Sequence, residues 1–400
     1  MKAILLALGM SFCGSLLALA DNVSKVEQIG DTHIAVAKQV DGGAAGNTSV
    51  FRQEGTGHEA TVRQTGITFG FNYSEIFQIG QANRAELVQD AHGFTVDIQT
   101  TTASLIRQNG IGNEAVVEQF NGFRMISDIQ QVGVDNRAGV EQGAGNGKAN
   151  LTIQQTGSGN EVEVHQLYDA AYAFTPGYNA AGVNQTGEGN GAKLIQDGRS
   201  DSMTSALIRQ DGSGNRVDAL QADPAGGSVN GLKISQHGAD NYAQVKQVTS
   251  LSNSSHNESR ISQTGLNNAA VNDQIDVALT TSDINQLGND NISSVEQNQG
   301  VWRSNIAVDG ASNQVDVLQT SVEGESSNDS RIQIDGVANI ATVMQTGVGG
   351  SNSSEIAEAG DNNMIWVDQD ASYHGDHSES AAMVLLRPGR PLGRAVSTSA

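Results

Sequence analysis

The sequence has few of the residues that usually hold a globular core together. Its 400 residues include one cysteine, four prolines and two tryptophans, and aromatic residues make up only 4% of the chain. The single cysteine, Cys13, excludes an intramolecular disulfide. Large apolar side chains are also scarce, since hydrophobic residues reach only 37% whereas glycine alone fills 47 positions. An ordinary globular core is therefore not expected.

Positive charge is scarce as well. Lysine and arginine together number 22 against 44 acidic residues, which gives a formal net charge of −22. Nucleic-acid binding relies on lysine and arginine contacts to phosphate, so we do not expect a nucleic acid as partner. Beyond residue 20 the sequence also lacks an apolar run of about 18 residues, and no membrane-spanning helix is predicted.

The N-terminal segment has the pattern of a secretory signal peptide. Residues 1–20 combine one basic residue with an apolar run and end in Ala18-Leu19-Ala20, which is typical of a signal peptidase site. The mature chain is then expected to start at Asp21. Cleavage would also remove Cys13, so no disulfide would stabilise the exported protein.

The rest of the chain consists largely of a repeat with a mean period of roughly 25 residues. In one copy, SLIRQNGIGNEAVVEQ, alternate positions carry Ser, Ile and Gln, then Gly and Asn, then Ala, Val and Gln. The same frame fits fourteen times, with first residues Ser24, Ser49, Ser74, Ser104, Ser127, Leu151, Ala181, Ala206, Leu232, Ser259, Ser282, Ser304, Ser330 and Ser354. Self-similarity at this period is typical of stacked repeats.

Some positions of the repeat are much stricter than others. Glycine fills its slot in all fourteen copies, from Gly30 to Gly360, and glutamine fills the closing slot in all fourteen, from Gln39 to Gln369. Two further polar slots, the first Gln and the Asn, are nearly as strict. Their exceptions are Val308, Ile334 and Glu358 in the first Gln slot, and His33 and His58 in the Asn slot.

The spacing of the strict positions predicts the fold. A period of two places the strict residues of each half-repeat on one face of a strand and the variable residues on the other. The turn Gln-x-Gly-x-x-Asn suits positive φ, which Gly adopts freely and Asn tolerates better than most residues. We therefore expect an all-β fold: a β-solenoid of about fourteen strand-turn-strand coils over residues 21–370, with two parallel sheets face to face. Residues 371–400 are expected to form a flexible tail.

The strict face is too polar for a core unless its amides find partners. Stacking the repeats in register supplies them, because each Gln or Asn can bond to the same residue one coil away. The predicted ladder residues are Gln28, Gln39, Gln53, Gln64, Gln78, Gln89, Gln108, Asn113, Gln119, Gln131, Asn136 and Gln142. The predicted turn glycines are Gly30, Gly55, Gly80, Gly110, Gly133 and Gly157. The two ends of such a stack are open sheet edges, which invite another copy to add.

The repeat resembles the curlin repeats of curli fibre subunits, whose outline is Ser-x5-Gln-x-Gly-x-x-Asn-x-Ala-x5-Gln. Here the order is Ser-x3-Gln-x-Gly-x-x-Asn-x-Ala-x3-Gln, and the resemblance covers about Ser24 to Gln369. One clear copy consists of Ser127, Gln131, Gly133, Asn136, Ala138 and Gln142.

This resemblance implies a secreted functional amyloid without enzymatic activity or cofactor. The protein would polymerise with itself outside the cell, into matrix fibres used in adhesion and biofilm, as the major or the nucleating subunit. Its further partners would be the other fibre subunit and the outer-membrane export machinery. It would pass through the periplasm to the cell surface or the extracellular space.

The chain departs from familiar curlin subunits in three ways. It has many more repeats, joined by linkers of 6 to 14 residues. Its first repeat begins three residues after the expected cleavage site, so the segment that directs curli subunits to their export channel is not recognisable. Finally, residues 381–400 carry three arginines and no acid. These residues, Arg387, Arg390 and Arg394, are either part of a disordered tail or an attachment element for an anionic surface or a partner subunit.

Particular residues bear on other possible functions of the chain. A carbohydrate-active enzyme needs a local cluster of acids, but outward acids such as Glu118 and Asp273 share their slot with basic and apolar residues. The segment Tyr373–His377, with two histidines and an aspartate, is either a metal site or a linker, and we expect no metal. Glu358 is either drift in a terminal repeat or a cap that resists stacking of another coil. The main alternative to a fibre subunit is a monomeric solenoid adhesin that binds a carbohydrate or a host surface.

Overall fold

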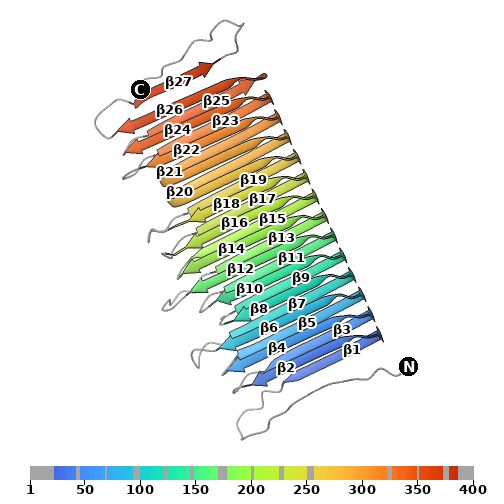
Figure 1. Ribbon diagram of the computed structural model, residues 1–400. Helices are drawn as coiled ribbons and strands as arrows, with labels where there is room; N and C mark the ends of the chain where they lie inside the picture. Colours follow the sequence, from blue (N-terminus) through green and yellow to red (C-terminus); the bar gives the residue numbers. More distant parts are fainter. Residues whose placement is uncertain are drawn as a thin grey trace. The chain divides into compact units, whose positions relative to one another are not determined.

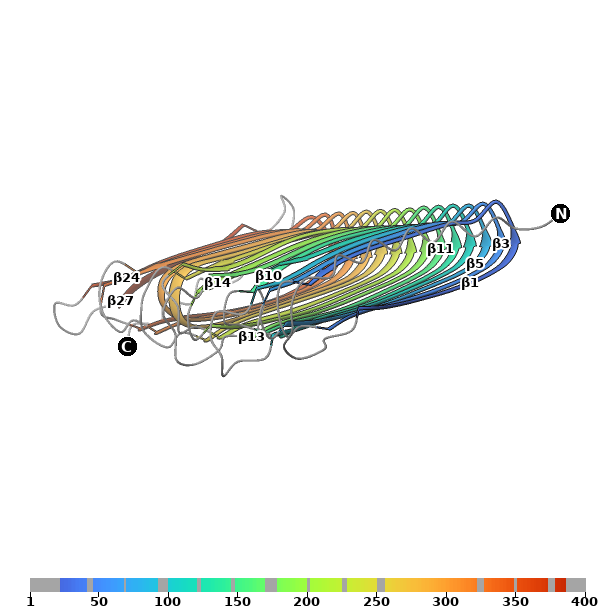
Figure 2. The same ribbon diagram turned by 90° about the horizontal axis from the view of Figure 1, so that it is seen from below.

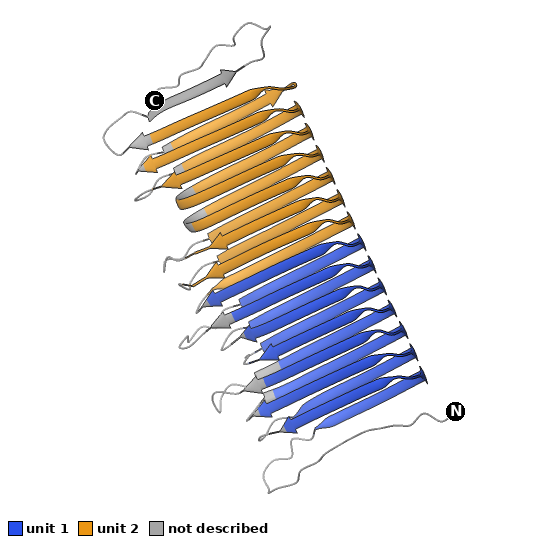
Figure 3. Cartoon of the chain, viewed as in Figure 1, with its two compact units in different colours: residues 1–201 blue, residues 202–400 orange. Residues whose placement is uncertain are grey.

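The computed structural model describes the repeats and short stretches next to them. The described residues are 22–41, 46–67, 70–92, 100–120, 124–144, 148–169, 178–199, 202–224, 229–249, 256–321, 327–348, 351–372 and 378–385. Over these ranges the chain forms strands and turns and has no helix, and so none that could cross a membrane. The protein is an all-β parallel solenoid with two sheets. It divides into unit 1, Met1–Asp201, and unit 2, Ser202–Ala400 (Figure 3).

In unit 1 each repeat contributes one strand to each of two sheets, which face one another (Figures 1 and 2). The first sheet contains β1 (Val23–Asp31), β3 (Asn47–Thr56), β5 (Gly70–Gln81), β7 (Thr100–Ile111), β9 (Arg124–Val134), β11 (Lys148–Ser158) and β13 (Tyr178–Glu188). The second sheet contains β2 (Ile34–Asp41), β4 (Glu59–Ile67), β6 (Arg84–His92), β8 (Glu114–Phe120), β10 (Arg137–Ala144), β12 (Glu161–Asp169) and β14 (Gly191–Arg199).

Unit 2 repeats this arrangement with two long strands that take part in both sheets. Its first sheet contains β15 (Met203–Ser213), β17 (Val229–Ala239), β19 (His256–Leu266), the later parts of β20 (Ala269–Asn289) and β21 (Ile292–Ala311), β23 (Ser327–Val337) and β25 (Ser351–Ala359). Its second sheet contains β16 (Arg216–Asp223), β18 (Tyr242–Val248), the earlier parts of β20 and β21, β22 (Gln314–Ser321), β24 (Ile340–Val348) and β26 (Met364–Ser372).

Neighbouring coils pair in parallel with every slot in register. Gln53 of β3 lies opposite Gln78 of β5, and Gly55 lies opposite Gly80. A slip of one residue would turn the strict face outward, so the alternation itself fixes this register. The strict face is buried in β9, whose burial alternates from Met125 to Gln131. The prediction of two parallel sheets built from strand-turn-strand repeats is confirmed.

The core between the sheets is made of narrow stripes. Ile76, Ile106 and Ile129 occupy the same slot in successive coils, and each is 0% exposed. Stripes of glutamine and asparagine lie beside this apolar stripe and are buried as completely. The scarcity of large apolar residues in the sequence is thus met by a core that is partly polar.

The C-terminal segment differs from the prediction of a flexible tail. Strand β27 (Ser378–Leu385) pairs with β26 in the antiparallel direction, with Met364 opposite Leu385. The exposed edge of a last strand offers unpaired N–H and C=O groups, and an antiparallel segment can satisfy them. The solenoid repeats cannot be continued in this way, because their coils pair in parallel. Residues 386–400 lie outside the described residues.

Candidate functional site

The turn of every repeat depends on glycine for two reasons. Gly110 has φ of +129°, and the other residues of its slot have φ between +108° and +141°. A Cβ atom on Gly110 would lie 1.9 Å from the carbonyl oxygen of Gly133 in the next coil. Side chains rarely adopt this backbone conformation, and the stacked turns leave no room for one. The predicted turn glycines all take this conformation.

The Asn slot differs from expectation in its backbone conformation. Positive φ occurs at the residue before the Asn slot, for example Ala82 at 53° and Asp135 at 54°, and not at the slot itself. Asn83 and Asn136 are buried and have no positive φ, and their side chains bond to neighbouring coils. The prediction that Asn serves the turn through positive φ is therefore wrong, because its amide belongs to a ladder.

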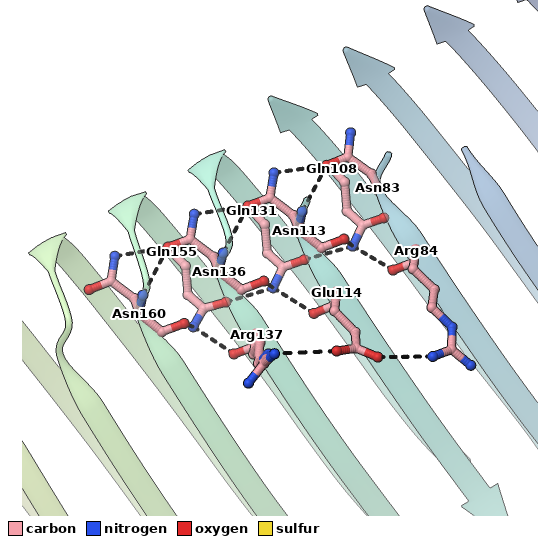
Figure 4. A network of polar contacts seen from close by, with 10 residues as sticks. All are labelled: Asn83, Arg84, Gln108, Asn113, Glu114, Gln131, Asn136, Arg137, Gln155 and Asn160. Atoms are coloured by element: carbon pink, nitrogen blue, oxygen red, sulfur yellow. Dashed lines mark hydrogen bonds and ion pairs between the residues drawn. The ribbon is translucent and has the colours of Figure 1, made fainter. Parts of the chain in front are cut away.

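Glutamines of the first Gln slot form one ladder in each unit. Gln108 donates from Nε2 to Oε1 of Gln131 at 2.8 Å, and Gln131 donates to Gln155 in the same way at 2.8 Å (Figure 4). The same Nε2 of Gln108 also donates to the backbone oxygens of Arg84 and Asn113, at 2.8 and 3.0 Å. The amide nitrogen is thus satisfied by partners in its own and adjacent coils, which a buried polar group requires.

The structure brings the predicted ladder residues together, coil by coil. In the first Gln slot the Nε2–Oε1 distances are 2.7 Å from Gln28 to Gln53, 2.9 Å from Gln53 to Gln78 and 2.8 Å from Gln78 to Gln108. In the closing slot they are 2.9 Å from Gln39 to Gln64, 2.8 Å from Gln64 to Gln89, 2.9 Å from Gln89 to Gln119 and 2.7 Å from Gln119 to Gln142.

The asparagines form a third ladder at the turn. Asn136 donates from Nδ2 to Oδ1 of Asn113 at 3.0 Å and to the carbonyl oxygen of Gly157 at 3.0 Å (Figure 4 shows the stacked side chains). Its backbone N–H also donates to Oδ1 of Asn113, at 3.1 Å. The asparagine thereby ties its coil to the coil before it and to the coil after it.

The glutamine ladders have a direction that the sequence does not reveal. Each Nε2 donates toward the C-terminal neighbour and each Oε1 accepts from the N-terminal neighbour, as Gln78, Gln108 and Gln131 show. The direction is fixed because Nε2 also meets backbone oxygens, which accept hydrogen bonds and cannot donate them. Reversing one amide would place two oxygens face to face. Any coil added at either end must respect this direction.

Sequence reasoning missed a fourth slot whose side chains form a ladder. It lies two residues before the first residue of each repeat, where Asn72 donates to Oδ1 of Asn47 at 2.8 Å and Asn47 donates to Asn22 at 3.0 Å. Both Asn47 and Asn72 are buried, at 0% and 1% exposed. Extending the period-two frame by one step toward the N-terminus would have found this slot.

In the Asn slot, His58 reproduces the bonds of asparagine, whereas His33 makes only the bond from Nε2 to the carbonyl oxygen of Ile29. The rings of His33 and His58 stack with centroids 5.1 Å apart and an angle of 4° between planes. The Nε2 of His58 lies 3.0 Å from the carbonyl oxygen of Glu54, and its Nδ1 accepts the backbone N–H of Asn83 at 3.2 Å. These two bonds require the neutral ring with its proton on Nε2. Burial, together with the nearby His33, lowers the pKa of His58.

The ladder of the first Gln slot stops within unit 2. Gln286 is its last glutamine, and its Nε2 donates to Oγ of Ser293 at 2.9 Å. The next two coils place Val308 and Ile334 in this slot, at 2% and 1% exposed. The last coil places Glu358 there, directly opposite Ile334.

Glu358 changes the hydrogen bonding of the last turn. Its Oε1 accepts a short hydrogen bond from Nδ2 of Asn363. In other coils this amide donates to the glycine oxygen of the following coil, as Asn339 does to Gly360 at 2.6 Å. Burial raises the pKa of the Glu358 carboxyl group.

The N-terminal coil has one uncovered side. Val26 is 36% exposed, whereas Phe51, which lies opposite it in the next coil, is 0% exposed. Other exposed apolar residues of this coil, such as Ile34 at 54%, lie in outward slots, since Ile34 is opposite Glu59 of the next coil. The first coil thus presents its ladder slots and its apolar stripe at the described edge of unit 1.

The outer face of unit 1 carries a row of alternating charges. Glu59, Arg84, Glu114 and Arg137 follow one another in the slot after Asn, with side-chain distances of 4.0 Å from Arg84 to Glu59, 3.3 Å from Arg84 to Glu114 and 3.6 Å from Arg137 to Glu114. Figure 4 shows the last three of these residues. These side chains are partly exposed, so each ion pair contributes little to stability.

The outward acids singled out in the sequence lie on outer faces of the strands, with Glu118 exposed. Among the residues that the structure describes, no group of three or more His, Cys, Asp and Glu side chains could hold a metal ion. The outward Asp273 is half-buried, and burial raises its pKa. The residues 1–20, 373–377 and the arginines Arg387, Arg390 and Arg394 lie outside the described residues.

Comparison with known proteins finds no relative that could indicate a function. The sequence matches no protein-family model, and no curated protein is significantly similar to it.

Proposed function

We propose that this protein is a curlin-like structural subunit that is exported and polymerises with itself into extracellular amyloid fibres. The observation that supports the proposal is the amide ladder, in which inward Gln and Asn side chains bond to the same slot of neighbouring coils. A second copy of the chain carries the same slots at the same spacing. It can therefore continue the ladders by the same hydrogen bonds that join neighbouring coils.

The uncovered first coil supports the same proposal. Its apolar and amide side chains match the slots of any other coil, and burying the inward Val26 against a second copy would remove apolar surface from water. A protein that remained a monomer would gain by covering or charging this edge. Adhesion and a role in biofilm matrix follow from the resemblance to curlin repeats, as do the fibre subunit partner and the export machinery.

The alternative proposal is a monomeric solenoid adhesin, and one observation favours it. Strand β27 occupies the edge of β26 by antiparallel pairing, which is a known way to prevent further strands from adding. Under this alternative the lateral surface would bind a carbohydrate or a host surface. The tail arginines remain a candidate attachment element under both proposals.

Assembly of purified residues 21–400 distinguishes the two proposals. A fibre subunit at tens of micromolar concentration should show a lag that added seeds remove. Its fibres should bind thioflavin and diffract at a spacing of about 4.7–4.8 Å. A monodisperse monomer that persists for days and ignores seeds would contradict polymerisation and favour the adhesin.

A further inference from the structure

The last coil carries Glu358 in the first Gln slot, where a second copy would have to resume the glutamine ladder. At each ladder step the first Gln slot donates from Nε2 toward the C-terminal neighbour, as Gln108 does to Gln131. Glu358 occupies this donor position in the last coil. An ionised carboxylate has no proton to donate. If a second copy stacked its first coil here, two oxygens would face each other without a proton between them: one of Glu358 and Oε1 of Gln28 in the second copy.

The same carboxylate also removes a second donor. The Asn363 amide donates to Glu358, whereas the corresponding amides of Asn313 and Asn339 donate to the glycine oxygen of the following coil, at 2.8 and 2.6 Å. The glycine that would follow Asn363 in a stacked copy is Gly30. A junction with a second copy would therefore lack two of the hydrogen bonds that join neighbouring coils while Glu358 is ionised.

We propose that Glu358 is a proton-operated cap: the ionised carboxylate hinders addition of a second copy to the last coil, and protonation permits it. This inference rests on the proposed function and adds its regulation. Glutamate protonated on one oxygen has nearly the shape of glutamine, with an O–H group in place of an N–H donor. Its proton would be donated to Oε1 of Gln28 in the incoming copy, and the Asn363 amide would become available to the carbonyl oxygen of Gly30.

The surroundings of Glu358 favour the neutral form. Burial raises its pKa, and the strand beneath it presents the apolar Ile334. The charged residues of the neighbouring described strands alternate onto the outer face; they are Asp329, Arg331, Asp335, Glu355, Asp368 and Asp370. In the turn, Asp361 accepts the backbone N–H of Val337. Stacking a second coil would bury the carboxyl group further and raise its pKa again.

Other titratable groups at the junction could also contribute to the pH dependence of assembly, so their contribution has to be distinguished from that of Glu358. The incoming first coil would bring Lys25, Glu27 and Lys38 on its outer slots and His33 in the Asn slot, close to Asn363. On the other sheet, Glu379 of β27 lies opposite Asp370 by backbone pairing, and β27 would have to leave the edge of β26 before a coil could add. All of these groups remain unchanged when only Glu358 is replaced.

The test compares the seeded assembly rate of residues 21–400 with that of Glu358→Gln between pH 4 and pH 8. The wild-type rate should fall with rising pH, by up to about tenfold for each unit above the pKa of Glu358, because only the protonated fraction adds. Glu358→Gln should assemble at pH 7 at least about tenfold faster than wild type and should lose most of this pH dependence. Glu358→Val, which copies the residue used at Val308, should also be faster at pH 7 but slower than Glu358→Gln, since valine supplies no donor.

The matched control is Glu355→Gln on the same strand. Glu355 is exposed and lies 3.9 Å from Arg331, so this variant makes the same change in net charge without touching the stacked slot. Glu355→Gln should keep the wild-type pH profile. Any contribution of His33 to this profile should be the same in wild type and in both variants. Identical profiles for wild type and Glu358→Gln would overturn the cap while leaving polymerisation intact. A failure of wild type and both variants to assemble at every pH would overturn the proposed function, and the cap with it.

Discussion

Unit 1 and unit 2 have the same coil geometry but fill one slot differently. All seven repeats of unit 1 place glutamine in the first Gln slot, whereas the last three repeats of unit 2 place Val308, Ile334 and Glu358 there. The backbone register is unchanged at these positions, since Val308 still lies opposite Ile334 and Gly310 opposite Gly336. The coil can therefore form with either an amide or an apolar residue in this slot. Both units keep the turn glycine and the closing glutamine without exception.

This difference separates two roles within the repeat. The glycine permits the turn, and no other residue replaces it in any copy. The glutamines specify which slot stacks on which, because a misplaced amide would be buried without a partner. Apolar residues pack just as well but tolerate slippage more easily, since dispersion contacts have no direction. Substitutions of the glycine and of the glutamines should therefore differ in their effect on stability.

The largest effect is expected from Gly110→Ala in unit 1. The new Cβ would lie 1.9 Å from the oxygen of Gly133, and φ of +129° is strained for alanine. We expect a loss of about 4 kcal/mol or more in the free energy of unfolding, measured by urea denaturation.

The control for this substitution is Gly139→Ala in β10. A Cβ at Gly139 would approach no atom closer than 3.9 Å, the oxygen of Val162. This variant should be neutral or stabilising by up to about 1 kcal/mol, because alanine is less flexible than glycine in the unfolded chain. Equal losses for the two variants would show that the turn geometry is not what requires glycine.

An intermediate effect is expected from breaking the ladder in its middle. Gln108→Ala leaves Gln78 without its acceptor and Gln131 without its donor, so we expect a loss of about 2–3 kcal/mol. Gln286→Ala in unit 2 deprives Gln263 of its acceptor, but the next coil presents Val308 and has no amide to lose a donor. The loss there should be smaller, by about 1 kcal/mol.

Two outcomes would contradict the ladder argument. The exposed Arg107 lies beside Gln108 in β7, and Arg107→Ala should cost under about 1 kcal/mol because its ion pair with Asp128 is on the surface. A loss for Arg107→Ala as large as that for Gln108→Ala would contradict the distinction between inner and outer faces. Equal losses for Gln108→Ala and Gln286→Ala would show that the ladder does not act as a chain of pairs.

The sequence predicts the fold because period and register are local properties of each repeat. Gly30 to Gly360 and Gln39 to Gln369 are invariant, and their spacing is enough to derive two sheets and inward stacking. The direction of the ladder could not be predicted, since it depends on which atoms of Gln108 face backbone oxygens. The hydrogen bond from Asn363 to Glu358 and the antiparallel pairing of β27 could not be predicted either. They arise where the repeat ends and periodicity no longer constrains the chain.

A smaller effect concerns pH and the first two coils of unit 1. The folded protein needs neutral His58, and burial lowers the pKa of this ring from its ordinary value of 6.5. The unfolded chain therefore binds the proton more readily, so stability is fully present above pH 6.5 and falls as the pH drops toward the folded pKa. The loss should be at most about 1.4 kcal/mol per pH unit. In His58→Asn, which restores the residue of the other coils, this part of the pH dependence should vanish in urea titrations between pH 5 and pH 8. An unchanged pH dependence would show that His58 does not titrate on unfolding.

The smallest effect concerns the outer faces, where the units also differ. Arg84→Glu would place three acids in a row with Glu59 and Glu114, in a slot where Arg84 now separates them. We expect a loss of about 1 kcal/mol at low salt, from lost ion pairs and new repulsion between neighbouring strands. Because these side chains are exposed, about 1 M salt should remove most of the repulsive part.

The matching position in unit 2 provides the control for the charged row. Ile292 occupies the same slot, is 48% exposed, and lies between Ala269 and Gln314, which carry no charge. Ile292→Glu therefore adds an acid without an adjacent acid in that slot, and its stability should respond little to salt. A similar salt response for Arg84→Glu and Ile292→Glu would mean that net charge, which is already −22, governs both changes. A response confined to Arg84→Glu would show that alternating charge helps to select the neighbouring coil in unit 1, where every first Gln slot already does so from the inside.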